Sequence, residues 1–232
     1  MLHIIPRSRP LVAVLALAAV AAHGCGSAPE HRPAASAPAV GEGVQAAAVR
    51  VVVLGDSLAA GLGLPEDEAF PALAAASLRA AGHTVEVVNA GVSGDTTAGG
   101  LARLDWVLQQ RPAILVVELG GNDALRGQPL AGIERNLREI VRGGRAAGAR
   151  VVLLGMDIPT NYGAQYGRGF AALYERVARD EGATLVPAFV RELASDPALL
   201  QPDGLHPTAE GQRRLAAELV PALAALLAGG PT

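Results

Sequence analysis

The chain has 232 residues, of which 50% are hydrophobic and 18% are charged, and this balance excludes a mostly disordered protein. All 19 basic residues are arginine, which excludes Walker-A nucleotide sites and Schiff-base chemistry, because both need lysine. A formal net charge of −3 and an aromatic content of 3% argue against nucleic acid as a partner.

Residues 1–25 have the pattern of an export signal. Two arginines precede an apolar run over 11–22, which is too short to span a bilayer and has the length of a signal-peptide core. The small residues that lead into Cys25 resemble the lipobox of bacterial lipoproteins, although the usual leucine is replaced by Ala22. We therefore expect an exported protein.

Two interpretations of Cys25 are open. In one, Cys25 carries lipid and attaches the protein to a membrane; in the other, the signal is cleaved conventionally and Cys25 has no role. Its place as the single cysteine at the end of the apolar run favours lipidation. The same resemblance implies the outer rather than the inner membrane, because Gly26 and not aspartate follows Cys25, so the prediction is a periplasmic or outer-membrane-anchored lipoprotein.

Residues 26–48 are rich in Ala, Pro, Ser and Gly and predict a flexible linker before a domain over 49–229. Strands are expected over 50–54, 84–89, 113–119, 150–155 and 184–186. Helices are expected over 68–81, 97–110, 129–147, 165–182 and 208–227. This alternation predicts an α/β fold with a parallel sheet covered on both faces.

The first predicted strand runs directly into Gly55, Asp56 and Ser57. A serine at that point lies at the carboxyl edge of the sheet, where open α/β folds bind their ligands. The following helix would direct free backbone N–H groups at the same place. The alternative is that Asp56 and Ser57 only cap a helix, since both residue types are good N-caps.

Three further polar clusters follow predicted strands or precede the last helix: 89–97, 118–123 and 202–207. The first contains Gly94, and the second contains Asn122, whose amide is a neutral donor suited to an oxyanion. The third places Asp203 three residues before His206, so that the carboxylate can orient the imidazole as a general base. Taken separately, these clusters also fit an N-cap, an Asx turn and a solvated loop.

Glu118 is unusual because it lies within a strongly apolar predicted strand. A buried carboxylate needs a partner, and Arg103 or Arg126 is the expected source. Metal ligands are scarce, since His83 and His206 are the only histidines of the predicted domain. We expect no metal and no cofactor.

Together, and in this order, the clusters resemble the SGNH/GDSL hydrolases, most closely the bacterial acyl-CoA thioesterase I, lysophospholipase L1 and arylesterase branch. The matching blocks are Gly55-Asp56-Ser57-Leu58, Gly94, Gly120-Gly121-Asn122-Asp123, and Asp203 with His206. The resemblance implies a flavodoxin-like, three-layer α/β/α fold with a five-stranded parallel sheet in the order 2-1-3-4-5.

The resemblance also implies roles for individual residues. Ser57 would be the nucleophile, His206 the general base, and Asp203 the group that orients His206. The oxyanion hole would consist of the N–H groups of Ser57 and Gly94 and the side chain of Asn122. These roles agree with the chemistry that a serine nucleophile requires.

A substrate groove is expected beside this site. Its predicted lining residues are Asp56, Leu58, Leu125, Pro159 and Tyr162. The last two belong to a segment after the fourth strand that the resemblance makes a wall of the groove; a purely structural connection is the alternative.

The predicted function is hydrolysis of short- to medium-chain carboxylic esters or thioesters through a Ser57 acyl-enzyme. The substrate would be a small-molecule acyl ester or a lysophospholipid, and export argues against acyl-CoA. Nothing in the sequence requires more than a monomer. Two alternatives stay open: a carbohydrate O-acetyl esterase, and a non-catalytic, surface-anchored binding module.

Overall fold

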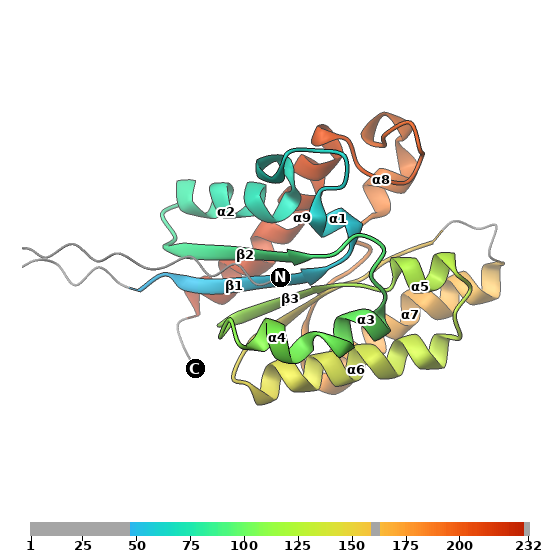
Figure 1. Ribbon diagram of the computed structural model, residues 1–232, viewed down its shortest axis with the longest axis horizontal. Helices are drawn as coiled ribbons and strands as arrows, with labels where there is room; N and C mark the ends of the chain where they lie inside the picture. Colours follow the sequence, from blue (N-terminus) through green and yellow to red (C-terminus); the bar gives the residue numbers. More distant parts are fainter. Residues whose placement is uncertain (1–46, 159–162, 230–232) are drawn as a thin grey trace, which may run out of the picture. The chain divides into compact units, whose positions relative to one another are not determined.

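The computed structural model describes residues 47–158 and 163–229. The predicted export signal, Cys25, nearly all of the predicted linker, Pro159 and Tyr162 lie outside these residues. Five parallel strands form one sheet in the order β2-β1-β3-β4-β5, which confirms the predicted order (Figure 1). The strands are β1 (Val49–Gly55), β2 (Val85–Gly91), β3 (Ile114–Glu118), β4 (Arg150–Leu154) and β5 (Thr184–Val186).

Helices connect the strands and cover both faces of the sheet (Figure 1). The longer helices are α2 (Phe70–Ala80), α3 (Thr97–Ala102), α6 (Leu130–Ala146), α7 (Ala164–Glu181) and α9 (Ala209–Ala228). The short helices are α1 (Ser57–Ala60), α4 (Leu104–Leu108), α5 (Gly121–Leu125) and α8 (Arg191–Ser195), with 3₁₀ turns η1 (Glu66–Glu68) and η3 (Pro197–Leu199). None of the helices in the described part of the chain is long and apolar enough to cross a membrane.

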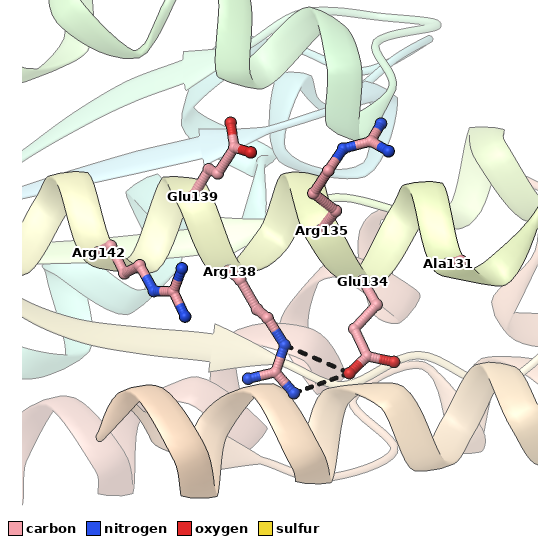
Figure 2. A pocket seen from close by; sticks show the side chains of 6 residues that line it. All are labelled: Ala131, Glu134, Arg135, Arg138, Glu139 and Arg142. Atoms are coloured by element: carbon pink, nitrogen blue, oxygen red, sulfur yellow. Dashed lines mark hydrogen bonds and ion pairs between the residues drawn. The ribbon is translucent and has the colours of Figure 1, made fainter.

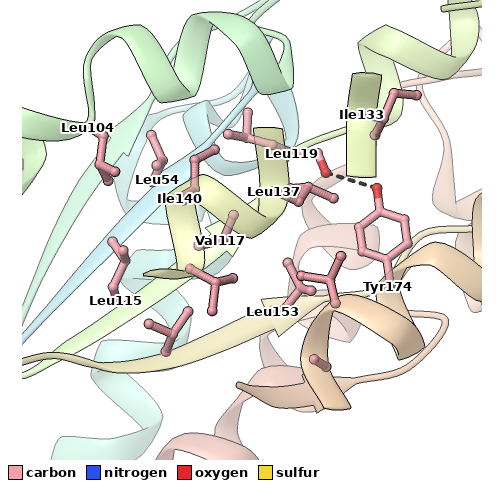
Figure 3. Packing of buried hydrophobic residues seen from close by; sticks show 14 of the residues in the cluster. Leu54, Leu104, Leu115, Val117, Leu119, Ile133, Leu137, Ile140, Leu153 and Tyr174 are labelled. Carbon is pink, nitrogen blue, oxygen red and sulfur yellow. Dashed lines mark hydrogen bonds between the residues drawn. The ribbon is translucent and has the colours of Figure 1, made fainter. Parts of the chain in front are cut away.

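Alternate residues of each central strand enter two separate cores. Val52 and Leu54 of β1 pack on the face covered by α6 and α7, whereas Val51 and Val53 pack on the face covered by α2 and α9. Figure 3 shows the first of these cores, with Leu54, Leu115 and Leu153 of the strands beside Leu137 and Ile140 of α6. Burial on both faces explains why these strands are continuous apolar runs.

One predicted helix is wrong in detail. The helix expected over 97–110 is divided into α3 and α4 by Arg103, which has φ −106° and ψ 9°. The guanidinium of Arg103 donates to the carbonyls of Ala90 and Gly55 and pairs with Asp95 at 2.8 Å. Contacts with the ends of two strands therefore end the helix where its sequence pattern would continue.

An ion-pair network joins α6 to α7. Arg138 binds Glu134 on its own helix and Glu181 on α7, and Arg142 also binds Glu181. These arginines line a surface depression on α6, where Figure 2 shows the bond between Arg138 and Glu134. Because both arginines are paired with carboxylates, we assign this cluster to holding the two helices together.

Candidate active site

The turn that follows β1 presents Ser57. Asp56 caps α1, since its Oδ1 accepts the N–H of Leu58 at 3.0 Å. Ser57 is the first residue of that helix and is not the cap. The carbonyls at the other end of the turn are also bonded: Asn89 donates to Ala59 at 2.7 Å and Gln212 to Leu58 at 3.0 Å. The capping interpretation is thus correct for Asp56, while the Ser57 side chain is directed elsewhere.

Ser57, His206 and Asp203 form a chain of hydrogen bonds. Ser57 Oγ lies 3.0 Å from His206 Nε2, and His206 Nδ1 lies 2.7 Å from Asp203 Oδ2. Because a carboxylate can only accept, Nδ1 carries the proton in this pair and Nε2 is free to accept the Ser57 hydroxyl proton. The geometry is that of a serine nucleophile with an oriented base.

Asp203 is held in place by its own turn. Its Oδ1 accepts the backbone N–H groups of Leu205 and His206 at 2.9 and 3.0 Å. The hydrogen bond from the His206 side chain, followed by these two backbone bonds, lowers the pKa of Asp203 to about 2. The Asp203 carboxylate is therefore charged near neutral pH.

The two other predicted oxyanion donors face the same cavity as Ser57. Gly94 lies in the loop after β2 with φ +80°, a conformation that favours glycine, and its carbonyl accepts from Arg126 at 3.0 Å. Asn122 lies on α5, and its Nδ2 donates to Asp56 Oδ2 at 3.0 Å. An amide nitrogen has two hydrogens, so Asn122 retains one for an oxyanion.

Burial dominates the electrostatics of Asp56. Its side chain is almost inaccessible to water, and this raises the pKa of Asp56 to about 6 against the opposing effects of the Leu58 N–H and the Asn122 amide. Asp56 thus joins the turn that contains Ser57 to Asn122 through a carboxyl group whose pKa is about 6.

A mainly apolar cavity of about 450 Å³ opens beside Ser57. Of the predicted groove residues, Asp56, Leu58 and Leu125 line it. Most of the apolar wall of the cavity was not predicted from the sequence. It comes from the α8 region and from two loops, and its residues are Leu62, Val190, Leu193, Ala194, Leu200 and Leu205. The available signal was the presence of leucines in segments with no helix or strand period.

The expected partner of Glu118 is wrong. Arg103 pairs with Asp95, and Arg126 binds the Gly94 carbonyl. Glu118 Oε2 instead accepts the backbone N–H groups of Asp56 and Ala59. Backbone N–H groups here take the place of the arginine as hydrogen-bond donors, and no residue type in the sequence indicates where such donors will lie. No group of three or more His, Cys, Asp or Glu side chains suited to a metal ion occurs within 47–158 and 163–229.

Comparisons with known proteins agree on one family. The model of the GDSL-like lipase/acylhydrolase family matches residues 53–214. The chain is 44% identical over 184 residues to the esterase TesA of Pseudomonas aeruginosa, covering 79% of this chain and 92% of that protein. It is 40% identical over 168 residues to thioesterase 1/protease 1/lysophospholipase L1 of Escherichia coli K12, covering 72% and 79%.

Solved structures extend the likeness to three dimensions. A crystal structure of TesA superposes with a TM-score of 0.74 at 43% identity, covering 76% of this chain and 99% of that chain. The SGNH-hydrolase family esterase AlinE4 gives a TM-score of 0.66 at 41% identity, covering 78% and 97%.

Proposed function

The chain belongs to the GDSL-like lipase/acylhydrolase family and is a carboxylic ester hydrolase, and we propose that Ser57 is the nucleophile of its acyl-enzyme. The observation that carries this proposal is the hydrogen-bonded chain from Asp203 through His206 to Ser57, at 2.7 and 3.0 Å, beside an apolar cavity.

Acylation begins when Ser57 Oγ attacks the carbonyl carbon of the ester. As the new C–O bond forms, the hydroxyl proton moves to His206 Nε2, and the charged imidazole is stabilised by Asp203. The carbonyl oxygen becomes an oxyanion, for which the N–H groups of Ser57 and Gly94 and the Asn122 amide are the donors. His206 then protonates the leaving alcohol or thiol as its bond to carbon breaks.

Deacylation repeats these steps with water. His206 accepts a proton from the water molecule that attacks the acyl carbon, and the same donors stabilise the second oxyanion. Collapse of this intermediate breaks the bond to Ser57 Oγ, which regains a proton from His206. The carboxylic acid leaves and the free enzyme is restored.

The cavity favours an acyl chain over a sugar. Its volume of about 450 Å³ is typical of small-ligand sites, and its lining offers leucine and valine side chains around Ser57. The relatives named as a thioesterase/lysophospholipase and as an esterase support esters or thioesters, and the volume of the cavity supports short- to medium-chain acyl groups. Lysophospholipids fit an exported enzyme better than acyl-CoA does.

The test is a chain-length profile. We expect residues 26–232 to hydrolyse p-nitrophenyl esters with the highest kcat/KM between butyrate and decanoate, because apolar lining contributes about 0.8 kcal/mol for each buried methylene until the cavity is full. Ser57→Ala, which lacks the proposed nucleophile, is the inactive control. Hydrolysis confined to the acetate ester would indicate the carbohydrate O-acetyl esterase alternative, and equal rates for both proteins would indicate the binding module.

The location is a separate proposal that rests on the pattern of residues 1–25. If Cys25 is lipidated, esterase activity sediments with the membranes of the producing bacterium, and Cys25→Ser moves most of it to the soluble periplasmic fraction. Activity that is soluble in both strains would support the conventionally cleaved signal.

A further inference from the structure

Glu118 is a fully buried carboxyl group that the catalytic steps above do not use. It is the last residue of β3, where it pairs in register with Gly55 of β1, and none of its surface is exposed. Its Oε2 accepts the N–H of Asp56 at 3.0 Å and the N–H of Ala59 at 3.3 Å. These two amides lie on either side of Ser57 along the chain, so one oxygen atom holds both ends of the nucleophile turn.

The contact of Glu118 Oε2 with the Ser57 turn is closely surrounded by other atoms. A Cβ added to Gly55 would lie 2.6 Å from Glu118 Oε2 and 2.5 Å from the Ala59 side chain. Glycine at this position therefore allows the carboxyl group to reach the turn. On the other side, Arg103 donates to the Gly55 carbonyl at 3.0 Å. The turn is fixed at its start and along its length.

The two oxygens of Glu118 have different surroundings. Oε2 receives two N–H groups, whereas Oε1 is buried and has no hydrogen-bond partner among the residues that the structure describes. An ionised carboxylate with a bare buried oxygen is costly, and the Asp56 carboxyl group is close enough to repel it. A neutral acid avoids that repulsion and still offers Oε2 as an acceptor.

We propose that Glu118 is a positioning residue that acts as a neutral carboxylic acid, with its proton on Oε1 while Oε2 holds the amides of Asp56 and Ala59 and thereby orients Ser57. The inference rests on the proposed role of Ser57 as nucleophile. Burial, and then the charge of Asp56, raise the pKa of Glu118 well above its ordinary value, and the two backbone bonds only partly oppose this.

Other titratable groups lie around Glu118 and Asp56 and affect how the two carboxyl groups respond to rising pH. Asp56 faces Glu118 from the turn, and the charges of His206 and Asp95 act on Asp56, with Asp95 itself paired to Arg103. The buried phenol of Tyr174 on α7 has its pKa raised by burial and by nearby carboxylates, of which Asp123 is the foremost. Loss of the Glu118 proton would place a second buried negative charge beside Asp56.

The sign of the pH effect follows from the raised pKa. Between the ordinary glutamic acid pKa and the raised one, the folded protein binds a proton that the unfolded chain has released. The stability contributed by the neutral Glu118 is therefore present in acid and is lost as pH rises through the folded-state value. Activity that depends on the same turn should fall as pH rises through the same value.

The decisive variant is Glu118→Gln, which keeps an acceptor oxygen and cannot ionise. We expect it to retain kcat at pH 7 within about threefold, since a positional change of about 1 Å would cost near 10²-fold, and to lack the fall of kcat with rising pH that we expect of the wild type. Glu118→Ala, which leaves both amides without an acceptor, is expected to lower kcat by about 10- to 100-fold at nearly constant KM.

Tyr174→Phe is the control, because it removes a buried phenol nearby whose pKa is also raised, and it should keep the wild-type fall of kcat with rising pH. Urea unfolding of wild type and Glu118→Gln from pH 5 to pH 9 gives an independent readout, in which the wild type loses more stability as pH rises. A Glu118→Gln protein that is folded but as inactive as the alanine variant, or whose kcat falls with rising pH as that of the wild type does, overturns the proposal.

Different results contradict the role of Ser57 as nucleophile and the role of Glu118 as a positioning residue. A wild-type protein whose hydrolysis survives Ser57→Ala contradicts the nucleophile itself. A wild type with Ser57-dependent hydrolysis, beside Glu118 variants that match it in kcat and in pH profile, contradicts the role of Glu118 alone.

Discussion

Ser57→Ala is expected to lower kcat for ester hydrolysis by about 10⁶-fold, the largest effect of any single substitution in this chain. The substitution removes the atom that the geometry places to attack the acyl carbon, Ser57 Oγ, 3.0 Å from the imidazole that would take its proton. The residual rate would come from the oxyanion donors and the cavity. Steady-state and single-turnover rates on a p-nitrophenyl butyrate substrate measure the loss.

His206→Ala should lower kcat nearly as much as Ser57→Ala does. The double variant should lower it little more than either single variant, because the nucleophile and its base act only together. Ser77→Ala is the matched control, since Ser77 is an exposed serine of α2 that donates to the carbonyl of Leu73. Losses that multiply in the double variant would show that Ser57 and His206 act independently and would contradict the proposed mechanism.

Asn122→Ala is expected to lower kcat by about 10²–10³-fold, or about 2.7–4 kcal/mol of transition-state stabilisation, with little change in KM. The amide is a neutral donor preorganised beside Ser57, and its loss matters only once charge develops on the substrate oxygen. A rise in KM with kcat unchanged would mean that Asn122 binds the ground state equally well, which would contradict an oxyanion role.

The same variant has a second expected effect through Asp56. The Asn122 amide donates to Asp56 Oδ2 and lowers the pKa of Asp56, which burial raises to about 6. Without the amide, the pKa of Asp56 rises further. Any part of the acid limb of kcat that reflects Asp56 then moves to higher pH.

Asn122→Asp separates shape from charge. It has nearly the same volume, but its carboxylate lies opposite Asp56 and offers the oxyanion a negative charge in place of a donor. We expect it to lose more activity than Asn122→Ala at pH 8 and to recover part of it in acid, where the new carboxyl group is protonated. An aspartate variant as active as wild type at pH 8 would exclude Asn122 as an oxyanion donor.

Local sequence was sufficient for most of the architecture. Runs such as Val51–Leu54 are apolar at every position because alternate side chains enter the two cores, and the intervening helices have apolar positions at helical spacing. The predicted strand order is confirmed as well, although it came from the resemblance to a family rather than from any strand by itself.

The polar residues of the candidate site were predicted from the sequence, but its apolar wall was not. Its polar residues could be predicted because each stands in a short block beside glycine, and blocks of this kind identify the family. The apolar wall could not, since leucines such as Leu62 and Leu205 are 44% and 46% exposed and follow no period. Their common cavity exists only once loops from distant parts of the chain pack around Ser57.

Sequence by itself determined most helices and strands, the order in which they follow one another along the chain, and the residue types available for ester hydrolysis. These features depend on neighbours within a few positions. Tertiary structure alone decided that Arg103 ends a helix by binding two strand ends, and that Glu118 meets the amides on either side of Ser57 rather than an arginine. Both outcomes depend on backbone groups brought together by sheet register, and a backbone N–H or C=O has no letter in the sequence.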